Sequence, residues 1–378
     1  MTRLAFYVPS LTVGGAERVT TSVANGLAAR GYDVDLLVSY YEGTFVDEIS
    51  DSVTVIDMHT PRVPAIGVGA AVPKLVSYFR RRDPEMVFTQ MLYASDVCLV
   101  AHMLAGSDAK VVPTVHNTVG MFDPPKERLV HRLATLLSDR AAQFVAVSDG
   151  AARSVVEELG VPEEKVSVLH NPIPVDEIRA QACERVQQRW LDDEGLDVVL
   201  GIGRLAPQKD FETFLRTFQR VHDADPDTRA IIVGQGPERD ELESLARELD
   251  IDGVVSFAGY VDNPYSYMAG ADAMLLSSRH EGLPTVLIEA MACGCPVVAT
   301  DCPSGPQTIL AGGTYGPLVD VSDDEGLAEA VLSTLADPLD STTLVDRARD
   351  FSPETVLDEY ESFVRNHGPV QTARPPEL

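Results

Sequence analysis

Two carboxylates eight positions apart, Glu281 and Glu289, enclose an apolar run in the segment EGLPTVLIEA. Pro284 fits the first position of a helix, where its missing N–H needs no partner. Glu281 would then lie before the helix, beside the N–H groups of Gly282 and Leu283. Glu289 would lie about 12 Å further along, buried among apolar residues. A buried carboxylate needs hydrogen-bond donors, which a ribose diol or sugar hydroxyls supply. A salt bridge or a surface position is the alternative for each glutamate taken alone.

Two cations, Arg204 and Lys209, occupy the segment GIGRLAPQKDF, which follows a predicted strand and precedes a predicted helix. Residues 181–378 carry 14 basic and 36 acidic side chains, a net charge of −22. Two cations in one loop of so acidic a region indicate a dianionic ligand such as a diphosphate. The alternative is an arginine paired with a nearby carboxylate.

Glycine and histidine mark two loops in the first half of the chain. Gly14 and Gly15 follow the first predicted strand and begin a helix, so free N–H groups there suit an anion. The pair is not a G-x-G-x-x-G fingerprint, and a plain tight turn is the alternative. His116 ends the strand of TVHNT, at the edge where ligands bind, although a lone histidine is more often structural.

The elements that position these residues alternate between β-branched runs and helical periodicity, which is typical of parallel sheets with crossover helices. Strands are predicted in LAFYV, DVDLLVS, VTVID, MVFT, VVPTV, QFVAVS, DVVLGIG, RAIIVG, VVSFAG, AMLLSS, CPVVAT and PLVD. Helices are predicted at 16–30, 68–82, 95–105, 125–138, 149–159, 211–222, 237–249, 284–292, 323–336 and 353–366. The fold class is therefore α/β, with two doubly wound domains.

Domain boundaries follow from the break at NPIPVDEI, which begins at Asn171 and contains two prolines. We expect a first domain at 1–172 and a second domain at 173–352. A closing helix at about 353–366 would pack back on the first domain, and 367–378 would form a flexible tail. Ligands bind at the carboxyl ends of such strands, so two domains facing each other would form a cleft.

The net charge of −28 opposes sequence-independent binding to nucleic acid. Residues 1–180 carry only −6 of it, from 16 basic and 22 acidic side chains. Only 5 of the 30 basic residues are lysine, which favours a halophilic origin, since high salt screens self-repulsion. A GC-rich genome is the alternative explanation for the scarce lysine, but it would not explain the excess acid.

The compartment is expected to be cytoplasmic. The N-terminus shows no signal peptide, and no apolar run reaches the roughly 18–20 residues that span a bilayer. The five cysteines are scattered, which argues against a disulfide framework. Cys293 and Cys295 are too close together and too isolated for a zinc site, so we predict no metal.

The ordered set of motifs GGAER, VHN, VS at Ser148, NPI, GRLAPQKD, HEGLPTVLIEA, GCPVVATD and GGTYGPLV resembles glycosyltransferase family 4. The resemblance extends from Pro9 to about Val319. It implies the GT-B fold, with two Rossmann-like domains facing across a cleft. The domain at 1–172 would be the acceptor-side domain, and the one at 173–352 would bind the nucleotide sugar. It also implies a retaining, metal-independent hexosyltransferase that has no cofactor and uses a nucleotide sugar as substrate.

The resemblance assigns a role to each site residue. Arg204 and Lys209 match the pair that neutralises the diphosphate. Glu281 matches the acid that binds donor-sugar hydroxyls, and Glu289 matches the one that holds the ribose. His116 matches the histidine near the reacting sugar carbon.

The resemblance also concerns three loops. Gly14 and Gly15 match the loop near the donor phosphates and the acceptor. The amides of Gly282 and Leu283 would face the phosphate. Asp301–Pro306, DCPSGP, resembles members that use UDP-linked galactose, glucose or their N-acetylamino forms.

The expected mechanism is a front-face substitution in which the departing phosphate takes the proton of the acceptor, because no carboxylate pair is spaced for double displacement. Three alternatives stay open: a sugar-nucleotide epimerase, a dinucleotide-dependent oxidoreductase and a catalytically inactive sugar-nucleotide-binding protein. The expected acceptor is a glycan or a polyprenyl-linked sugar. The basic, partly apolar segments Lys74–Pro84 and Lys126–Leu133 indicate either peripheral membrane contact or ordinary amphipathic helices.

Overall fold

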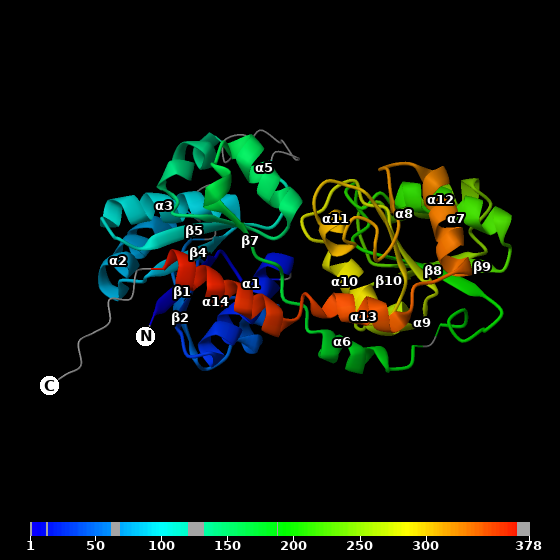
Figure 1. The fold of residues 1–378 in the computed structure, drawn as a ribbon, viewed down its shortest axis with the longest axis horizontal. Helices are drawn as coiled ribbons and strands as arrows, with labels where there is room; N and C mark the ends of the chain where they lie inside the picture. The colour runs from blue at the N-terminus through cyan, green and yellow to red at the C-terminus, as the bar shows by residue number, and fades with distance from the viewer. Residues whose placement is uncertain (1, 13, 62–68, 120–131, 187, 369–378) are drawn as a thin grey trace. The chain divides into compact units, whose positions relative to one another are not determined.

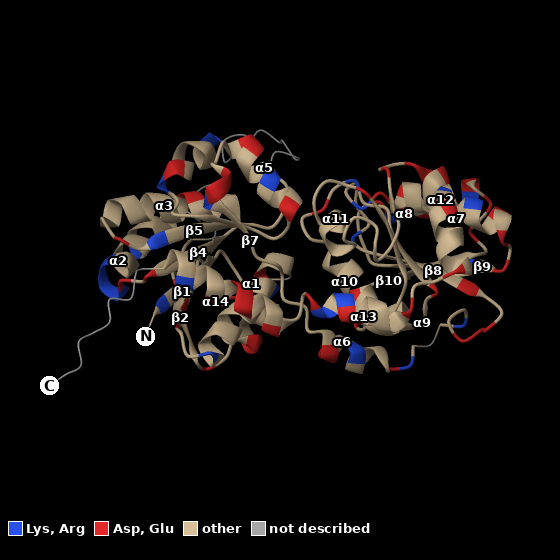
Figure 2. Ribbon diagram, in the orientation of Figure 1, with Lys and Arg blue, Asp and Glu red and all other residues tan. Residues whose placement is uncertain are grey.

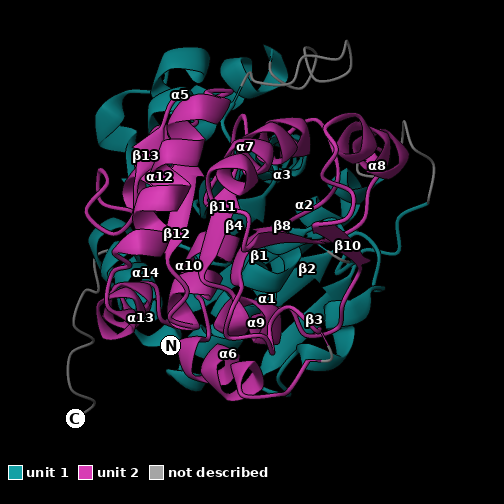
Figure 3. Cartoon of the chain, turned by 90° about the vertical axis from the view of Figure 1, so that its right-hand side faces the viewer, with its two compact units in different colours: residues 1–147, 151–172, 353–378 teal, residues 148–150, 173–352 magenta. Residues whose placement is uncertain are grey.

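The computed structural model describes residues 2–12, 14–61, 69–119, 132–186 and 188–368. Contacts divide the chain into two compact units, shown in teal and magenta in Figure 3. Unit 1 comprises Met1–Val147, Ala151–Pro172 and Pro353–Leu378, and unit 2 comprises Ser148–Gly150 and Ile173–Ser352. The short segment Ser148–Gly150 thus groups with unit 2, although we expected it in the first domain. Most of the predicted tail at 367–378 lies outside the described residues.

Unit 1 contains a parallel sheet of seven strands in the order β3-β2-β1-β4-β5-β6-β7 (Figure 1). The strands are β1 (Arg3–Val8), β2 (Asp33–Val38), β3 (Val53–Asp57), β4 (Met86–Gln90), β5 (Lys110–Val115), β6 (Phe144–Ala146) and β7 (Val166–Val168). The first six were predicted. The three-residue β7 was missed because so short a run carries no periodicity.

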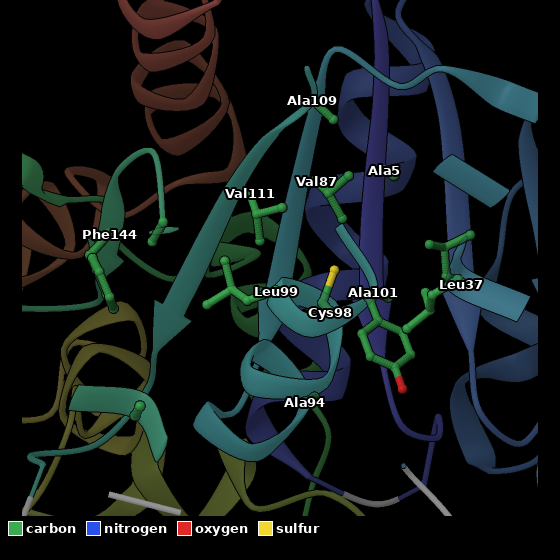
Figure 4. Close-up of a cluster of buried hydrophobic side chains, with 14 of the residues drawn as sticks. Ala5, Leu37, Val87, Ala94, Cys98, Leu99, Ala101, Ala109, Val111 and Phe144 are labelled. Atoms are coloured by element: carbon green, nitrogen blue, oxygen red, sulfur yellow. The ribbon is translucent and has the colours of Figure 1, made fainter. Parts of the chain in front are cut away.

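Both faces of this sheet are buried, as the continuous apolar runs predict. Successive side chains of a strand point to opposite faces, so β1 contributes Leu4 and Phe6 to one hydrophobic cluster and Ala5 and Tyr7 to another. Figure 4 shows the second cluster, in which Cys98 and other side chains of a covering helix meet the strands. The sheet is therefore a rigid base for the loops at its edges.

Four helices of unit 1 are crossover connections between its strands, and a fifth, α14, ends the chain. They are α1 (Gly15–Ala29), α2 (Val72–Arg82), α3 (Leu92–Ala105), α5 (Asp149–Leu159) and α14 (Pro353–His367). The helix α3 begins three residues before the predicted start. Of the helix predicted at 125–138, residues 132–137 are helical, and the part before 132 lies outside the described residues.

The last helix, α14, packs on unit 1. Its Tyr360 and Phe363 join the cluster that contains Phe88. Arg30 at the end of α1 forms an ion pair with Asp358 of α14 at 2.6 Å. Apolar contact and ion pairing thus return the C-terminal helix to the first sheet.

Unit 2 contains a parallel sheet in the order β10-β9-β8-β11-β12-β13. Its strands are β8 (Asp197–Ile202), β9 (Thr228–Val233), β10 (Val255–Gly259), β11 (Ala273–Leu276), β12 (Val297–Thr300) and β13 (Leu318–Val319). Its helices are α6 (Val175–Ala182), α7 (Phe211–Ala224), α8 (Arg239–Glu248), α9 (Tyr265–Gly270), α10 (Thr285–Ala292), α11 (Gly305–Ile309), α12 (Asp324–Ala336) and α13 (Ser341–Arg349).

All six strands of unit 2 were predicted, whereas four of its helices were not. Of these, α9 and α11 are too short to show helical periodicity, and α6 and α13 are mixed in sequence. Because α6 begins at Val175, the break predicted to begin at Asn171 covers only residues 171–174.

Acidic residues are spread over the helices of both units, and three consecutive arginines, Arg80–Arg82, end α2 (Figure 2). No helix in the described part of the chain is both long and apolar enough to cross a bilayer. On α3, however, Val100, Met103 and Leu104 expose 37%, 47% and 59% of their surface. These side chains form an apolar strip on the outside of unit 1.

Candidate active site

The strand order of unit 2 reverses between β8 and β11, which pair in parallel. In open α/β sheets ligands bind at such a switch point, outside the carboxyl ends of the strands. The loop after β8 carries Arg204 and Lys209, and the loop after β11 carries Glu281. The fold therefore brings together the two loops that the sequence singles out.

Lys209 and Glu281 form an ion pair, with the ammonium nitrogen 2.5 Å from Oε1 of the carboxylate. Ser278 donates a second hydrogen bond to the same oxygen over 2.6 Å. The side chains are only 19% and 8% exposed, so water screens the pair little. A cation and an acid that sequence reasoning assigned to different ligand groups thus neutralise each other.

A second ion pair, which sequence reasoning missed, joins the same loops. Arg279 donates from Nε and Nη2 to the two carboxylate oxygens of Asp210 over 2.9 and 3.1 Å. Asp210 is the N-cap of α7, adopts φ 48°, and accepts a hydrogen bond from the Thr213 hydroxyl over 2.8 Å. An aspartate directly before a predicted helix is an N-cap signal that could have identified it. Its bidentate contact fixes the end of the Lys209 loop.

Arg204 differs from Lys209 because its side chain is exposed and forms no ion pair with any described residue. Its backbone is nevertheless fixed, since Gly203 and Leu205 donate to Val233 and Gln235, each over 3.0 Å. The two cations are therefore not equivalent: one is already neutralised and the other faces solvent.

The glycine of the neighbouring loop permits this backbone pairing. Gly234 has φ 140°, and a Cβ there would lie 1.9 Å from the Gly203 carbonyl oxygen. No side chain could be accommodated at that distance. The segment GQG, which was not singled out from the sequence, thus supports the Arg204 loop.

The helix α10 begins at Thr285, one residue later than predicted, with Pro284 as N-cap and no side-chain cap. Gly282 and Leu283 are buried in the loop before it. The first N–H groups of a helix lack intrahelical partners and carry partial positive charge, so this end of α10 suits an anion. Glu281 and the α10 terminus thus lie next to each other, as expected.

Glu289 lies on α10, but the prediction of a buried carboxylate was wrong, because the side chain is half-buried. Thr285 and Val286, one turn before it, are half-buried too, whereas Leu287 and Ile288 are fully buried. Glu289 thus shares the partly exposed face of the helix. Burial and, second, its carboxylate raise the pKa of Cys293, one turn further on, to about 12.

In unit 1, Gly14 is the N-cap of α1 and Gly15 is its first residue. A Cβ on Gly14 would lie 2.2 Å from Oε2 of Glu17, while nothing lies within 4 Å of one on Gly15. The Glu17 carboxylate thus lies over the loop, and burial raises its pKa. This acid was part of the GGAER motif but was assigned no role.

His116 follows β5 and is half-buried. Its Nε2 forms a hydrogen bond with Oε1 of Gln90, the last residue of β4. Desolvation lowers the pKa of the imidazole to about 4, so the ring is neutral near pH 7. The histidine therefore lies at the carboxyl edge of its sheet, held in one orientation by Gln90.

Comparison with known proteins gives matches over most of the chain. Residues 13–177 match the sequence model described as Glycosyltransferase Family 4, and residues 184–351 match Glycosyl transferases group 1. The lipopolysaccharide core biosynthesis glycosyltransferase LpsE of Rhizobium meliloti (strain 1021) is 36% identical over 353 residues, covering 92% of this chain and 94% of its own. The chain belongs to glycosyltransferase family 4.

Other similar proteins extend the comparison. An N-acetylgalactosaminyltransferase of Campylobacter jejuni is 27% identical over 89% of this chain and 91% of its own; its full name is N-acetylgalactosamine-N,N'-diacetylbacillosaminyl-diphospho-undecaprenol 4-alpha-N-acetylgalactosaminyltransferase. Among solved structures, Anabaena Alr3699/HepE in complex with UDP has a TM-score of 0.79 at 22% identity, covering 97% of this chain and 100% of that one. This likeness confirms the GT-B fold of the family 4 glycosyltransferase described here.

Proposed function

We propose that this glycosyltransferase moves a hexose or N-acetylhexosamine from a UDP-sugar to a glycan or polyprenyl-linked acceptor, with retention of configuration and without a metal ion. The observation that carries the proposal is the Lys209–Glu281 ion pair beside the uncapped start of α10. Cation, acid and helix N-terminus at one switch point match the needs of a sugar diphosphate.

Departure of the diphosphate builds negative charge on its oxygens, which electrostatic contacts must stabilise. Lys209 and Arg204 supply cations for this purpose, and Gly282 and Leu283 supply amides. These groups take the place that a divalent metal has in other transferases, which supports a metal-independent reaction. A diphosphate would draw Lys209 partly away from Glu281, leaving that carboxylate to accept hydrogen bonds from the sugar.

The remaining site residues divide by ligand group. Glu289, on the half-buried face of α10, is proposed to accept hydrogen bonds from the ribose diol. His116, neutral near pH 7, is proposed to orient the sugar and to stabilise positive charge on the reacting carbon rather than act as a general base. Gly14 and Gly15 are proposed to lie near the donor phosphates and the acceptor.

Two similar proteins support the choice of substrates. The solved structures of Alr3699/HepE include complexes with UDP and with UDP-glucose, which favours a uridine donor. The printed name of the C. jejuni relative specifies a diphospho-undecaprenol acceptor, which favours a polyprenyl-linked glycan. The DCPSGP segment agrees with a UDP-linked galactose, glucose or N-acetylamino sugar.

Such an acceptor would place the enzyme in the cytoplasm at the inner face of the membrane. Of the predicted basic segments, Lys74–Pro84 includes Arg80, which donates to the backbone oxygen of Leu104 over 2.9 Å, and Arg82, which pairs with buried Asp35 at 2.6 Å. These contacts are structural. Lys126–Leu133 lies largely outside the described residues. The exposed apolar strip of α3 beside Arg80 is therefore the better-supported membrane contact.

Liposome co-sedimentation tests this contact. Replacing Met103 and Leu104 by aspartate should abolish binding to anionic vesicles. The same change at Leu339, an exposed leucine of unit 2, should not affect it. Undiminished binding of the α3 variant would remove the membrane contact from the proposal.

The function itself is tested by mixing the purified enzyme in EDTA with UDP-, GDP- and ADP-sugars and an undecaprenyl-diphosphate-linked saccharide. We expect release of UDP and an α-linked product from an α-linked donor, read by NMR. An inverted product would contradict retention, and activity that EDTA abolishes would contradict metal independence. Transfer from none of these donors would refute the proposed function.

A further inference from the structure

The carbonyl oxygen of Gly282, just before α10, is held by two side chains. Ser304 Oγ lies 3.0 Å and Ser148 Oγ 2.9 Å from it, and the two hydroxyl oxygens are 2.7 Å apart. Both serines belong to unit 2 and are 3% and 0% exposed. The two hydroxyl groups have two protons for these three contacts. If one hydroxyl donates to the other, the second still donates to the carbonyl, so the carbonyl oxygen of Gly282 accepts at least one hydrogen bond.

The backbone of Ser304 adopts a conformation that is strained for any residue with a side chain. It has φ 99° and ψ −104°, a region that glycine populates readily and L-residues rarely adopt. The next residue, Gly305, packs so closely that a Cβ would lie 2.2 Å from Cδ of Pro284. A glycine at 304 would relieve the strain, whereas the serine supplies a hydroxyl to Gly282. Strained residues of this kind cluster at functional sites.

The two hydrogen bonds fix the direction of the following N–H group. In a planar trans peptide the C=O and N–H bonds point in opposite directions. With the Gly282 carbonyl directed at the buried serines, the Leu283 N–H must point away from them. No acceptor within the described part of the chain meets this N–H.

We propose that Ser304 and Ser148 are positioning residues that hold the Gly282–Leu283 peptide so that the Leu283 N–H points at the diphosphate of the donor. The inference rests on the proposed function and adds a specific role for two buried hydroxyls. Holding the amide before the donor binds lowers the reorganisation needed as charge develops on the leaving phosphate. The contribution is confined to the diphosphate and does not extend to the nucleoside.

The experiment compares Ser304→Gly and the double variant Ser148→Ala/Ser304→Ala with the wild-type enzyme. For each we measure the thermal unfolding midpoint, donor kcat and KM, and the dissociation constants of UDP and uridine. Ser304→Gly should unfold at the same or a higher temperature yet bind UDP about tenfold more weakly, with uridine unchanged. The double variant should lose more. Ser266→Ala, which removes a buried hydroxyl of α9 bonded locally to Asn263, is the matched control and should bind UDP normally.

A merely structural serine would lose stability and affinity together, whereas a positioning serine loses affinity while stability holds. Unchanged UDP binding by folded Ser304→Gly and by the double variant would overturn the inference and leave the proposed transferase activity intact. Equal weakening of UDP and uridine would also overturn it, since the effect would then not lie at the diphosphate. If the wild-type enzyme bound neither UDP, GDP nor ADP, both the inference and the proposed function would fall.

Discussion

The two units differ in whether the buried acids near the carboxyl ends of their strands have a cationic partner. In unit 1, Glu17 and Asp96 are 7% and 6% exposed and form no ion pair with any described residue. In unit 2, Glu281 and Asp210 are equally buried, but each meets a cation, Lys209 or Arg279. Both sheets are parallel and doubly wound, so the difference lies in the loops and not in the fold.

The lack of a cationic partner in unit 1 affects the pKa of its two buried acids. Desolvation without a cation raises the pKa of Glu17 and raises that of Asp96 to about 7. Both acids are therefore harder to ionise than an exposed carboxyl group, and Asp96 is partly protonated near pH 7. In unit 2, Glu281 and Asp210 instead form hydrogen-bonded ion pairs with Lys209 and Arg279. Paired charges in a loop suit a charged ligand such as the diphosphate proposed above, whereas acids that are harder to ionise suit uncharged hydroxyl groups.

The largest expected effect comes from breaking the ion pair of unit 2. Lys209→Ala removes one preorganised cation and leaves Glu281 buried and uncompensated, so kcat should fall about 100-fold or more. Steady-state release of UDP measures it. Arg216→Ala, which breaks an exposed ion pair with Glu212 on α7, is the control and should retain full activity. Near-normal turnover of the Lys209 variant would refute the diphosphate role.

A second prediction tests the uncompensated acid of unit 1. The pKa of Asp96 is raised to about 7 from an ordinary value of 3.8, so the folded chain binds more protons than the unfolded chain between about pH 4 and pH 7. The free energy of unfolding should therefore fall as pH rises through this window. Asp96→Asn removes the ionisable group. The free energy of unfolding of the variant, minus that of the wild type, should therefore be larger at pH 8 than at pH 4, by on the order of 2 kcal/mol.

Urea unfolding at both pH values, followed by a probe in unit 1, measures this difference. Glu85→Gln, at a half-buried acid of the same unit, is the control. If the difference in unfolding free energy between the wild type and Asp96→Asn stays constant with pH, Asp96 is solvated and ionised.

A smaller effect is expected at the proposed ribose contact. Because Glu289 is half-buried, Glu289→Ala should raise the KM for the donor about tenfold and change kcat little. Glu289→Gln keeps one acceptor oxygen, so its KM for the donor should lie between those of the wild type and of Glu289→Ala. A change in kcat without a change in KM would place Glu289 at the reacting sugar instead.

The smallest expected effect is the change in unfolding midpoint with salt concentration, which should differ between the two units. Unit 2 contains 13 basic and 34 acidic residues, a net charge of −21, and unit 1 contains 17 and 24, a net charge of −7, so screening should stabilise unit 2 more. Raising KCl from low to molar concentration should increase the unfolding midpoint by a few degrees, mainly in the transition of unit 2. Calorimetry resolves the two transitions, and a salt response confined to unit 1 would contradict the halophilic interpretation.

The sequence predicted most of the fold because strands are local features. Every strand of unit 2 and six of unit 1 follow from runs of β-branched and apolar residues, and the parallel topology follows from their alternation with helices. The omissions are short or mixed elements such as β7 and α9. The ordered motifs also determined the family, and GRLAPQKD among them lies in the loop directly after a strand, β8.

The tertiary structure alone decided which charges pair and which stay exposed. Lys209 and Glu281 are separated by 72 positions, and no spacing rule relates them. The same holds for Arg279 and Asp210, and for the two serines that meet at Gly282. Ion pairing and desolvation depend on distance through space, which only the packing of loops at the edge of a finished sheet determines.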